Sequence, residues 1–160
     1  MNSRYLLLIF SIALISFSAF AQTEKSRNDR VLELCKSVGK IKQLPNDPSE
    51  KGVDSTYDAI VEAGSAVVPC LIDNITITKV MTDPRCPTIS KGTTVGDVSY
   101  FVLVDILKID FVKFLPADVV ESYKTNGAYA YHDYIDRRGA RKELQAKLRN
   151  WYDANQLKSK

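Results

Sequence analysis

Apolar residues recur at intervals of three and four along most of the chain, and this spacing predicts helices rather than strands. The first such stretch covers about residues 26–44 and stops at a proline-bearing loop, residues 45–53. The second covers residues 54–63, where Asp54 or Ser55 caps the start and a glycine ends the pattern.

A third helical stretch covers residues 66–76, with Pro69 near its first turn, where the missing N–H costs nothing. Its exit stays open, because the β-branched run at residues 75–78 also fits a strand. Residues 82–92 carry two prolines and form the longest connection, which is typical of a variable surface loop.

Residues 95–109 are apolar on nearly every side of a helix, apart from a thin polar stripe that includes Asp97 and Asp105. Thr94, with Asp97 three residues later, has the pattern of a capping box. The β-branched content would also suit a strand, but the length and the cap favour a helix. A helix that is apolar nearly all round belongs in the middle of a fold.

Two more helices are expected before the C-terminus. One covers residues 117–125 and ends in an Asn-Gly pair at 126–127, as a left-handed cap requires. The last covers residues 140–154 and carries Glu143 and Lys147 as an (i, i+4) pair. The whole pattern predicts an all-α fold of about five to six helices, arranged as a compact helical bundle.

The N-terminus has the pattern of a cleavable signal peptide. Arg4 precedes an apolar run at residues 5–20, and residues 19–21 form an A-x-A cleavage motif. The run is shorter than the roughly 20 predominantly apolar residues that a membrane span needs. We therefore expect residues 1–21 to be removed, leaving residues 22–160 as a single helical domain, periplasmic or secreted, without stable membrane insertion.

Charge is unevenly distributed over the expected mature chain. Residues 137–160 hold eight basic and two acidic side chains, a net charge of +6. With Arg4 removed, this leaves −4 for residues 22–136. The basic end fits an acidic partner or an anionic lipid, and it also fits docking onto the acidic body of the same chain. Nucleic acid is not expected as a partner, because the excess is modest.

Three cysteines, Cys35, Cys70 and Cys86, remain in the mature chain, and an oxidising compartment favours pairing. Three different single bridges can form, and we favour Cys70 with Cys86, because this bridge would close the long connection between two predicted helices. A loop of that length is worth about 3 kcal/mol in the chain-entropy model. Cys35 would then be a small buried hydrophobe.

Tyrosine and arginine gather before the last predicted helix. Both types are enriched in the hot spots of protein interfaces, so this segment is the predicted contact surface for a partner, with the 82–92 loop as a second surface. A rival hypothesis makes His132, with Asp133 or Asp136, an acid–base pair of a small cell-envelope enzyme. The predicted contact residues are Tyr129, Tyr131, Tyr134, Arg137 and Arg138.

Sequence motifs for metals and cofactors are not found. The single histidine and the scattered aspartates lack the H-x-x-x-H or C-x-x-C spacing of zinc sites, so no metal is expected. There is no glycine-rich phosphate loop and no G-x-S-x-G motif. We therefore expect a protein that acts without a cofactor.

The second and third predicted helices carry a distinctive order of residues. Residues 57–74 read Tyr-Asp-Ala-Ile-Val-Glu-Ala-Gly-Ser-Ala-Val-Val-Pro-Cys-Leu-Ile-Asp-Asn. This order resembles one HEAT-type helical repeat, in which Gly64 would permit the tight turn and Pro69 would set the second helix. The helix that begins at Val95 and the block at residues 141–152 also resemble segments of small secreted bacterial proteins of unassigned activity. The resemblance implies a short stack of helical hairpins, a kind of surface that usually binds other macromolecules.

These observations together favour an exported protein-binding module without catalytic activity, whose partner is another protein of the cell envelope. An immunity-type protein that blocks a toxin is one concrete form of this hypothesis. The alternatives are the enzyme that uses His132 and a structural or stress-related protein. The oligomeric state and the identity of the partner do not follow from the sequence.

Overall fold

The computed structural model describes residues 24–45, 47–82, 84–85 and 92–157. The predicted signal peptide and most of the predicted 82–92 loop, including Cys86, lie outside these residues. Helices dominate the described chain, so the predicted all-α class is confirmed. After a helix at residues 24–37, the elements are η1 (Val38–Lys40), α2 (Ser55–Ala63), η2 (Gly64–Ala66), α3 (Val68–Asn74), β1 (Val80–Met81), β2 (Thr93–Thr94), α4 (Val95–Leu107), α5 (Ala117–Asn126), α6 (Ala128–Ile135) and α7 (Ala140–Gln156).

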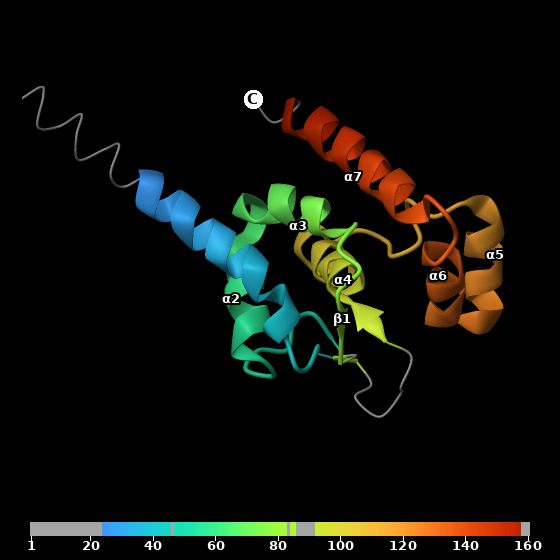
Figure 1. Ribbon diagram of the computed structural model, residues 1–160, viewed down its shortest axis with the longest axis horizontal. Coiled ribbons are helices and arrows are strands. Elements are labelled where there is room, and N and C mark those ends of the chain that lie inside the picture. The colour runs from blue at the N-terminus through green and yellow to red at the C-terminus, as the bar shows by residue number, and fades with distance from the viewer. Residues whose placement is uncertain (1–23, 46, 83, 86–91, 158–160) are drawn as a thin grey trace, which may run out of the picture.

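Helix α4 lies at the centre of the fold, between α2 and α3 on one side and the α5–α6 pair on the other (Figure 1). Every residue from Val95 to Leu103 is buried, which confirms the central position that its apolar pattern predicts. Helix α7 packs across α3 and α6. Among the described helices, none is both long enough and apolar enough to cross a membrane.

The predicted capping signals set the helix boundaries. The Asp54 carboxylate accepts the backbone N–H groups of Thr56 and Tyr57, at 2.8 and 3.0 Å, and so begins α2. Thr94 and Asp97 form a reciprocal capping box at the start of α4. Such caps satisfy backbone donors that have no partner inside the helix, so each fixes where its helix starts.

Helices α2 and α3 form a hairpin in the segment that resembles a helical repeat. Gly64 has a φ of 56°, which a residue with a β-carbon rarely adopts, and it ends α2. Pro69 lies in the first turn of α3, where the proline is tolerated. One hairpin of this kind occurs in many helical folds, so membership of a repeat family stays a prediction.

Two predicted segments differ from the structure. The first helix gives way to η1 at Val38 and then to extended chain, instead of continuing to residue 44. Residues 77–81 leave α3 as extended chain, and β1 pairs with β2 in a short antiparallel ladder. Gly96 in the first turn of α4 allows the chain that leaves α3 to pass close to α4, because a β-carbon at residue 96 would clash with the backbone oxygen of Ile75.

Residues 128–135 form α6, in a segment where no helix was predicted. Gly127 has a φ of 54° and serves as the end of α5 and the start of α6. The α5–α6 hairpin buries Tyr131, Tyr134 and Ile135 on its inner side. Gly127 therefore joins α5 and α6 into a second helical hairpin.

The disulfide joins Cys35 to Cys70, with a distance of 6.2 Å between their α-carbons. This corrects the predicted Cys70–Cys86 bridge, because Cys70 can form only one such bond. The helix at residues 24–37 lies beside α3, and the Asn74 side-chain amide donates to the backbone oxygen of Cys35 at 3.2 Å. The predicted burial of Cys35 is confirmed, with 4% of its surface exposed.

Candidate functional site

An open hollow of about 560 Å³ lies where the α3–β1 connection meets the turn between α6 and α7. Thr76, Thr78 and Thr94 line one side. Residues 135–142, except Ala140, line the other. We call this hollow the corner pocket.

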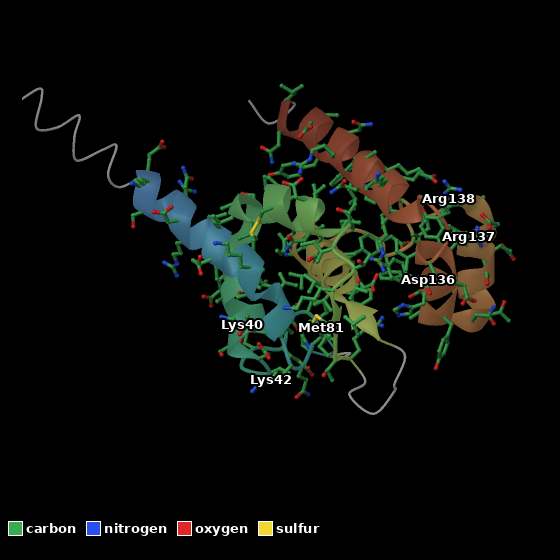
Figure 2. The ribbon with its side chains drawn as sticks, viewed as in Figure 1. Lys40, Lys42, Met81, Asp136, Arg137 and Arg138 are labelled. Carbon is green, nitrogen blue, oxygen red and sulfur yellow. A yellow bond between two sulfur atoms is a disulfide. The ribbon has the colours of Figure 1, made fainter. Side chains whose placement is uncertain are left out.

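The turn that forms the corner pocket has a defined backbone course. Gly139 has a φ of 86°, a left-handed conformation that lets the chain reverse into α7. The backbone N–H of Ala140 donates to the oxygen of Arg137 at 3.1 Å. The Tyr134 hydroxyl reaches the oxygen of Ala140 at 3.4 Å from the core side. Figure 2 shows Asp136, Arg137 and Arg138 on the resulting corner, away from Lys40 and Lys42.

The corner pocket is lined by four basic side chains and one carboxylate, that of Asp136. Two of the basic groups already have partners, because Arg137 pairs with Asp118 at 2.8 Å and Arg141 is held by a buried carboxylate. Arg138 and Lys142 are exposed and make no ion pair with any residue that the structure describes. These two cations are the ones available to a ligand.

Helix α7 also presents its N-terminus at the corner pocket. Its N-terminal flanking residue is Gly139, which has no side chain to accept the N–H groups of the first turn. The only acidic side chain in that turn, Glu143, forms an ion pair with Lys147 at 2.8 Å. The partial positive charge of the helix end therefore adds to that of the neighbouring side chains.

A buried polar network lies directly behind the corner pocket. The Asp97 side chain is only 2% exposed. One of its oxygens forms an ion pair with the Arg141 guanidinium group at 3.0 Å and accepts a hydrogen bond from the Tyr131 hydroxyl at 3.0 Å, and Arg141 also donates to the second oxygen at 3.2 Å. This second oxygen also accepts the backbone N–H and the hydroxyl of Thr94 at 2.8 and 2.7 Å. Arg141 also donates to the backbone oxygen of Ile75 at 3.3 Å. The network ties α4, α6 and α7 together.

Two opposing effects set the pKa of the Asp97 carboxyl. Burial alone raises it, but the hydrogen bonds from Arg141 and Thr94 outweigh burial and hold the pKa below its usual range. The same carboxylate, together with burial, raises the pKa of the Tyr131 hydroxyl well above its usual range. Near neutral pH, Asp97 is therefore ionised and Tyr131 is uncharged. The Asp97 carboxylate balances the positive charge of Arg141 and holds its side chain in place.

The structure divides the five predicted contact residues into two groups. Tyr131 and Tyr134 are buried, with 0% and 2% of their surfaces exposed, which corrects the expectation that they face a partner. Residue 131 lies on the inner face of α6, where its ring stacks on Tyr100 with centroids 5.3 Å apart. Arg137 and Arg138 line the corner pocket.

Tyr129, the fifth predicted contact residue, is 59% exposed in the first turn of α6. It does not line the corner pocket, because it lies at the opposite end of this eight-residue helix. A helix of that length extends about 12 Å. Tyr129 therefore lies on the same helix as Ile135, which lines the corner pocket, but outside the pocket itself.

Part of the basic charge of α7 is docked on the rest of the chain. Arg141 pairs with buried Asp97, and Arg149 pairs with Asp73 on α3 at 2.6 Å. Arg149 also donates to the backbone oxygen of Pro69 at 2.8 Å. Self-docking thus accounts for some of the C-terminal excess. Among the described residues of this end, the two cations without an ion pair, Arg138 and Lys142, line the corner pocket.

His132 is half-buried on α6. Its Nε2 lies 2.9 Å from the Arg85 guanidinium group, and its ring meets the edge of Tyr131. The Arg85 guanidinium group in turn stacks over the Phe101 ring, 4.0 Å from the centroid. The histidine does not line the corner pocket, and an enzymatic role for it stays a prediction.

Asp105 marks a second region of interest. Its carboxylate lies between two neighbouring hollows of about 210 and 480 Å³, lined largely by apolar side chains. Burial raises the pKa of this carboxyl, although the hydrogen bond from the Tyr57 hydroxyl at 3.0 Å opposes the change. The corner pocket is the better candidate, because it brings together several charged groups of one sign.

Sequence reasoning found Asp97 as a cap but missed its pairing with Arg141, which lies 44 residues later. It also missed Thr76, Thr78 and Lys142 as members of a site. Within the described residues, no group of three or more histidine, cysteine or acidic side chains is placed to hold a metal ion.

Comparison with known proteins gives no match to this chain. No protein-family model matches its sequence. No curated protein and no solved structure matches it either. The geometry of the corner pocket and the residues that form it are therefore the guide to function.

Proposed function

We propose that this chain is an exported protein-binding module that acts without a cofactor, and that the corner pocket is the centre of its contact surface. The observation that carries the proposal is a pair of cations, Arg138 and Lys142, that make no ion pair within the described part of the chain and lie beside the open N-terminus of α7. Cations in such a place attract an acidic partner and guide its approach.

The proposed export has two supports. Residues 1–21 have the pattern of a signal peptide. The Cys35–Cys70 disulfide links the N-terminal helix to the core, and bonds of this kind persist mainly in oxidising compartments. A partner in the cell envelope follows from that location.

The buried network supports a binding role by fixing the site before a partner arrives. Asp97 holds Arg141 in the first turn of α7, and Tyr131 holds Asp97 from α6. A site that is already ordered loses less conformational entropy on binding than a flexible one. An immunity-type protein that blocks the active site of a toxin is one form of such a module.

The proposal is tested by capture of the partner with tagged residues 22–160 from the periplasmic and secreted fractions of the source cell. The charge-removing variant Arg138→Gln with Lys142→Gln should lose the partner. Lys40→Gln, which removes an exposed cation far from the corner in Figure 2, should retain it. Equal capture by both variants, or no stoichiometric partner for the wild type, would count against the proposal.

A further inference from the structure

We infer that the corner pocket binds an acidic segment of the protein partner, with carboxylates placed against Arg138, Lys142 and the first turn of α7. This inference rests on the proposed function and specifies the chemistry of the partner. Four of the five ionisable side chains that line the pocket are basic. The two that make no ion pair with the described residues, Arg138 and Lys142, lie on either side of Gly139.

The turn before α7 brings these two cations close to a helix end. Arg138 immediately precedes Gly139, and Lys142 follows it by three residues, so both lie next to the start of α7. A carboxylate at that position meets a guanidinium fork, an ammonium group and backbone N–H donors together. Charge-assisted hydrogen bonds of this kind are roughly twice as strong as neutral ones.

The size of the pocket distinguishes a peptide from a small ion. A hollow of about 560 Å³ is many times larger than the roughly 30 Å³ that one water occupies in the liquid. Thr76 and Thr78 line its far side and offer hydroxyl groups to a backbone. A segment of several residues fills this space, whereas a single inorganic anion leaves most of it to solvent.

Asp136 limits what such a segment can contain. Its exposed carboxylate lies on the rim of the pocket and repels a continuous run of acidic residues. A neutral or basic residue beside the bound carboxylates would avoid this repulsion, and a basic one would pair with Asp136. The structure therefore favours a mixed acidic segment over a uniformly acidic one.

The test measures binding of labelled peptides to mature wild-type protein by fluorescence anisotropy at low salt. The probes are a Glu-Glu-Lys-Glu-Glu peptide, its all-glutamate counterpart and a Gln-Gln-Lys-Gln-Gln control. We expect the mixed acidic peptide to bind most tightly. Arg138→Gln or Lys142→Gln should each weaken binding of this peptide about tenfold, because each variant loses one charge-assisted hydrogen bond. Lys40→Gln should change it by less than about twofold.

Each other outcome overturns the inference. Equal binding of the glutamine control peptide would show that the pocket does not recognise carboxylates. Equal weakening by Lys40→Gln would show general electrostatic attraction. Displacement of the peptide by an equimolar amount of inorganic phosphate would show a small-anion site.

The inference and the proposed function fail separately. If the peptides do not bind but capture of the natural partner still depends on Arg138 and Lys142, the function stands and the acidic segment is refuted. Thermal unfolding of each variant gives the folding control. Arg138 and Lys142 are exposed and make no ion pair with the described residues, so both glutamine variants should unfold like the wild type.

Discussion

Replacing Arg141 by methionine tests the buried network that fixes the corner pocket. The substitution keeps an unbranched side chain in place while it removes the guanidinium group from Asp97. The two side chains are only 13% and 2% exposed, so water cannot take over the lost interaction. Removing one partner of a buried ion pair costs about 3–5 kcal/mol, because the other charge stays buried. In the variant, Asp97 keeps its hydrogen bonds from Thr94 and Tyr131. We therefore expect the free energy of unfolding to fall by about 3 kcal/mol, the lower end of this range.

The assay is urea unfolding at neutral pH with the disulfide intact, in which the free energy of unfolding is extrapolated to water. Arg149→Met is the matched control, because Arg149 lies on the same helix and forms an ion pair at 2.6 Å with Asp73. The Asp73 side chain is 71% exposed, and such surface pairs contribute at most about 1 kcal/mol. Equal losses of unfolding free energy in the two variants would show that burial does not make the Arg141–Asp97 pair more important than a surface pair.

The same variant has a predicted pH signature. The pKa of Asp97 is lowered in the folded state, so its ionisation adds stability above the unfolded pKa of about 3.9. That stability is lost as the pH falls through the folded pKa. In Arg141→Met burial dominates and this contribution disappears. The difference in unfolding free energy between wild type and variant should therefore shrink as the pH falls below about 4. A constant difference would mean that the arginine acts by packing alone.

Three further predictions concern the supports of the fold. Gly96→Ala should lower the free energy of unfolding by about 1–3 kcal/mol, since the added methyl group meets the neighbouring backbone; a variant as stable as the wild type would contradict this close approach. Peptide mapping without reduction should recover Cys35 linked to Cys70, and replacing both by alanine should cost about 4 kcal/mol for a 35-residue separation. Tyr131→Phe should cost about 1–2 kcal/mol in thermal unfolding, while Tyr129→Phe should cost nothing measurable; equal effects would place both rings at the surface.

Local signals were sufficient for most helix boundaries. The Asp54 cap and the capping box of Thr94 and Asp97 act within three residues, so their effects can be derived from neighbouring sequence alone. Helix α6 was missed because Gly127 ends one helix and begins the next, and this double use looks like an ordinary stop signal. Without a predicted helix at these residues, the burial of Tyr131 on the inner face of α6 could not be predicted.

The site itself depends on contacts between distant parts of the chain. Arg141 lies 44 residues from Asp97, and the corner pocket combines residues 76–78 with the turn before α7. No local pattern specifies such a meeting. A polar residue within a helix that is apolar nearly all round, as Asp97 is, was the one available sign of a buried partner.

The most direct test of the central claim is site-specific photo-crosslinking in the source cell. A photoreactive amino acid replaces Arg138 in one variant and Lys40 in another, and the crosslinked products are identified by mass spectrometry. The account predicts one dominant protein partner, from the cell envelope, crosslinked at position 138 and not at position 40. Equal crosslinking at both positions, or none at 138, would contradict a binding surface at the corner pocket.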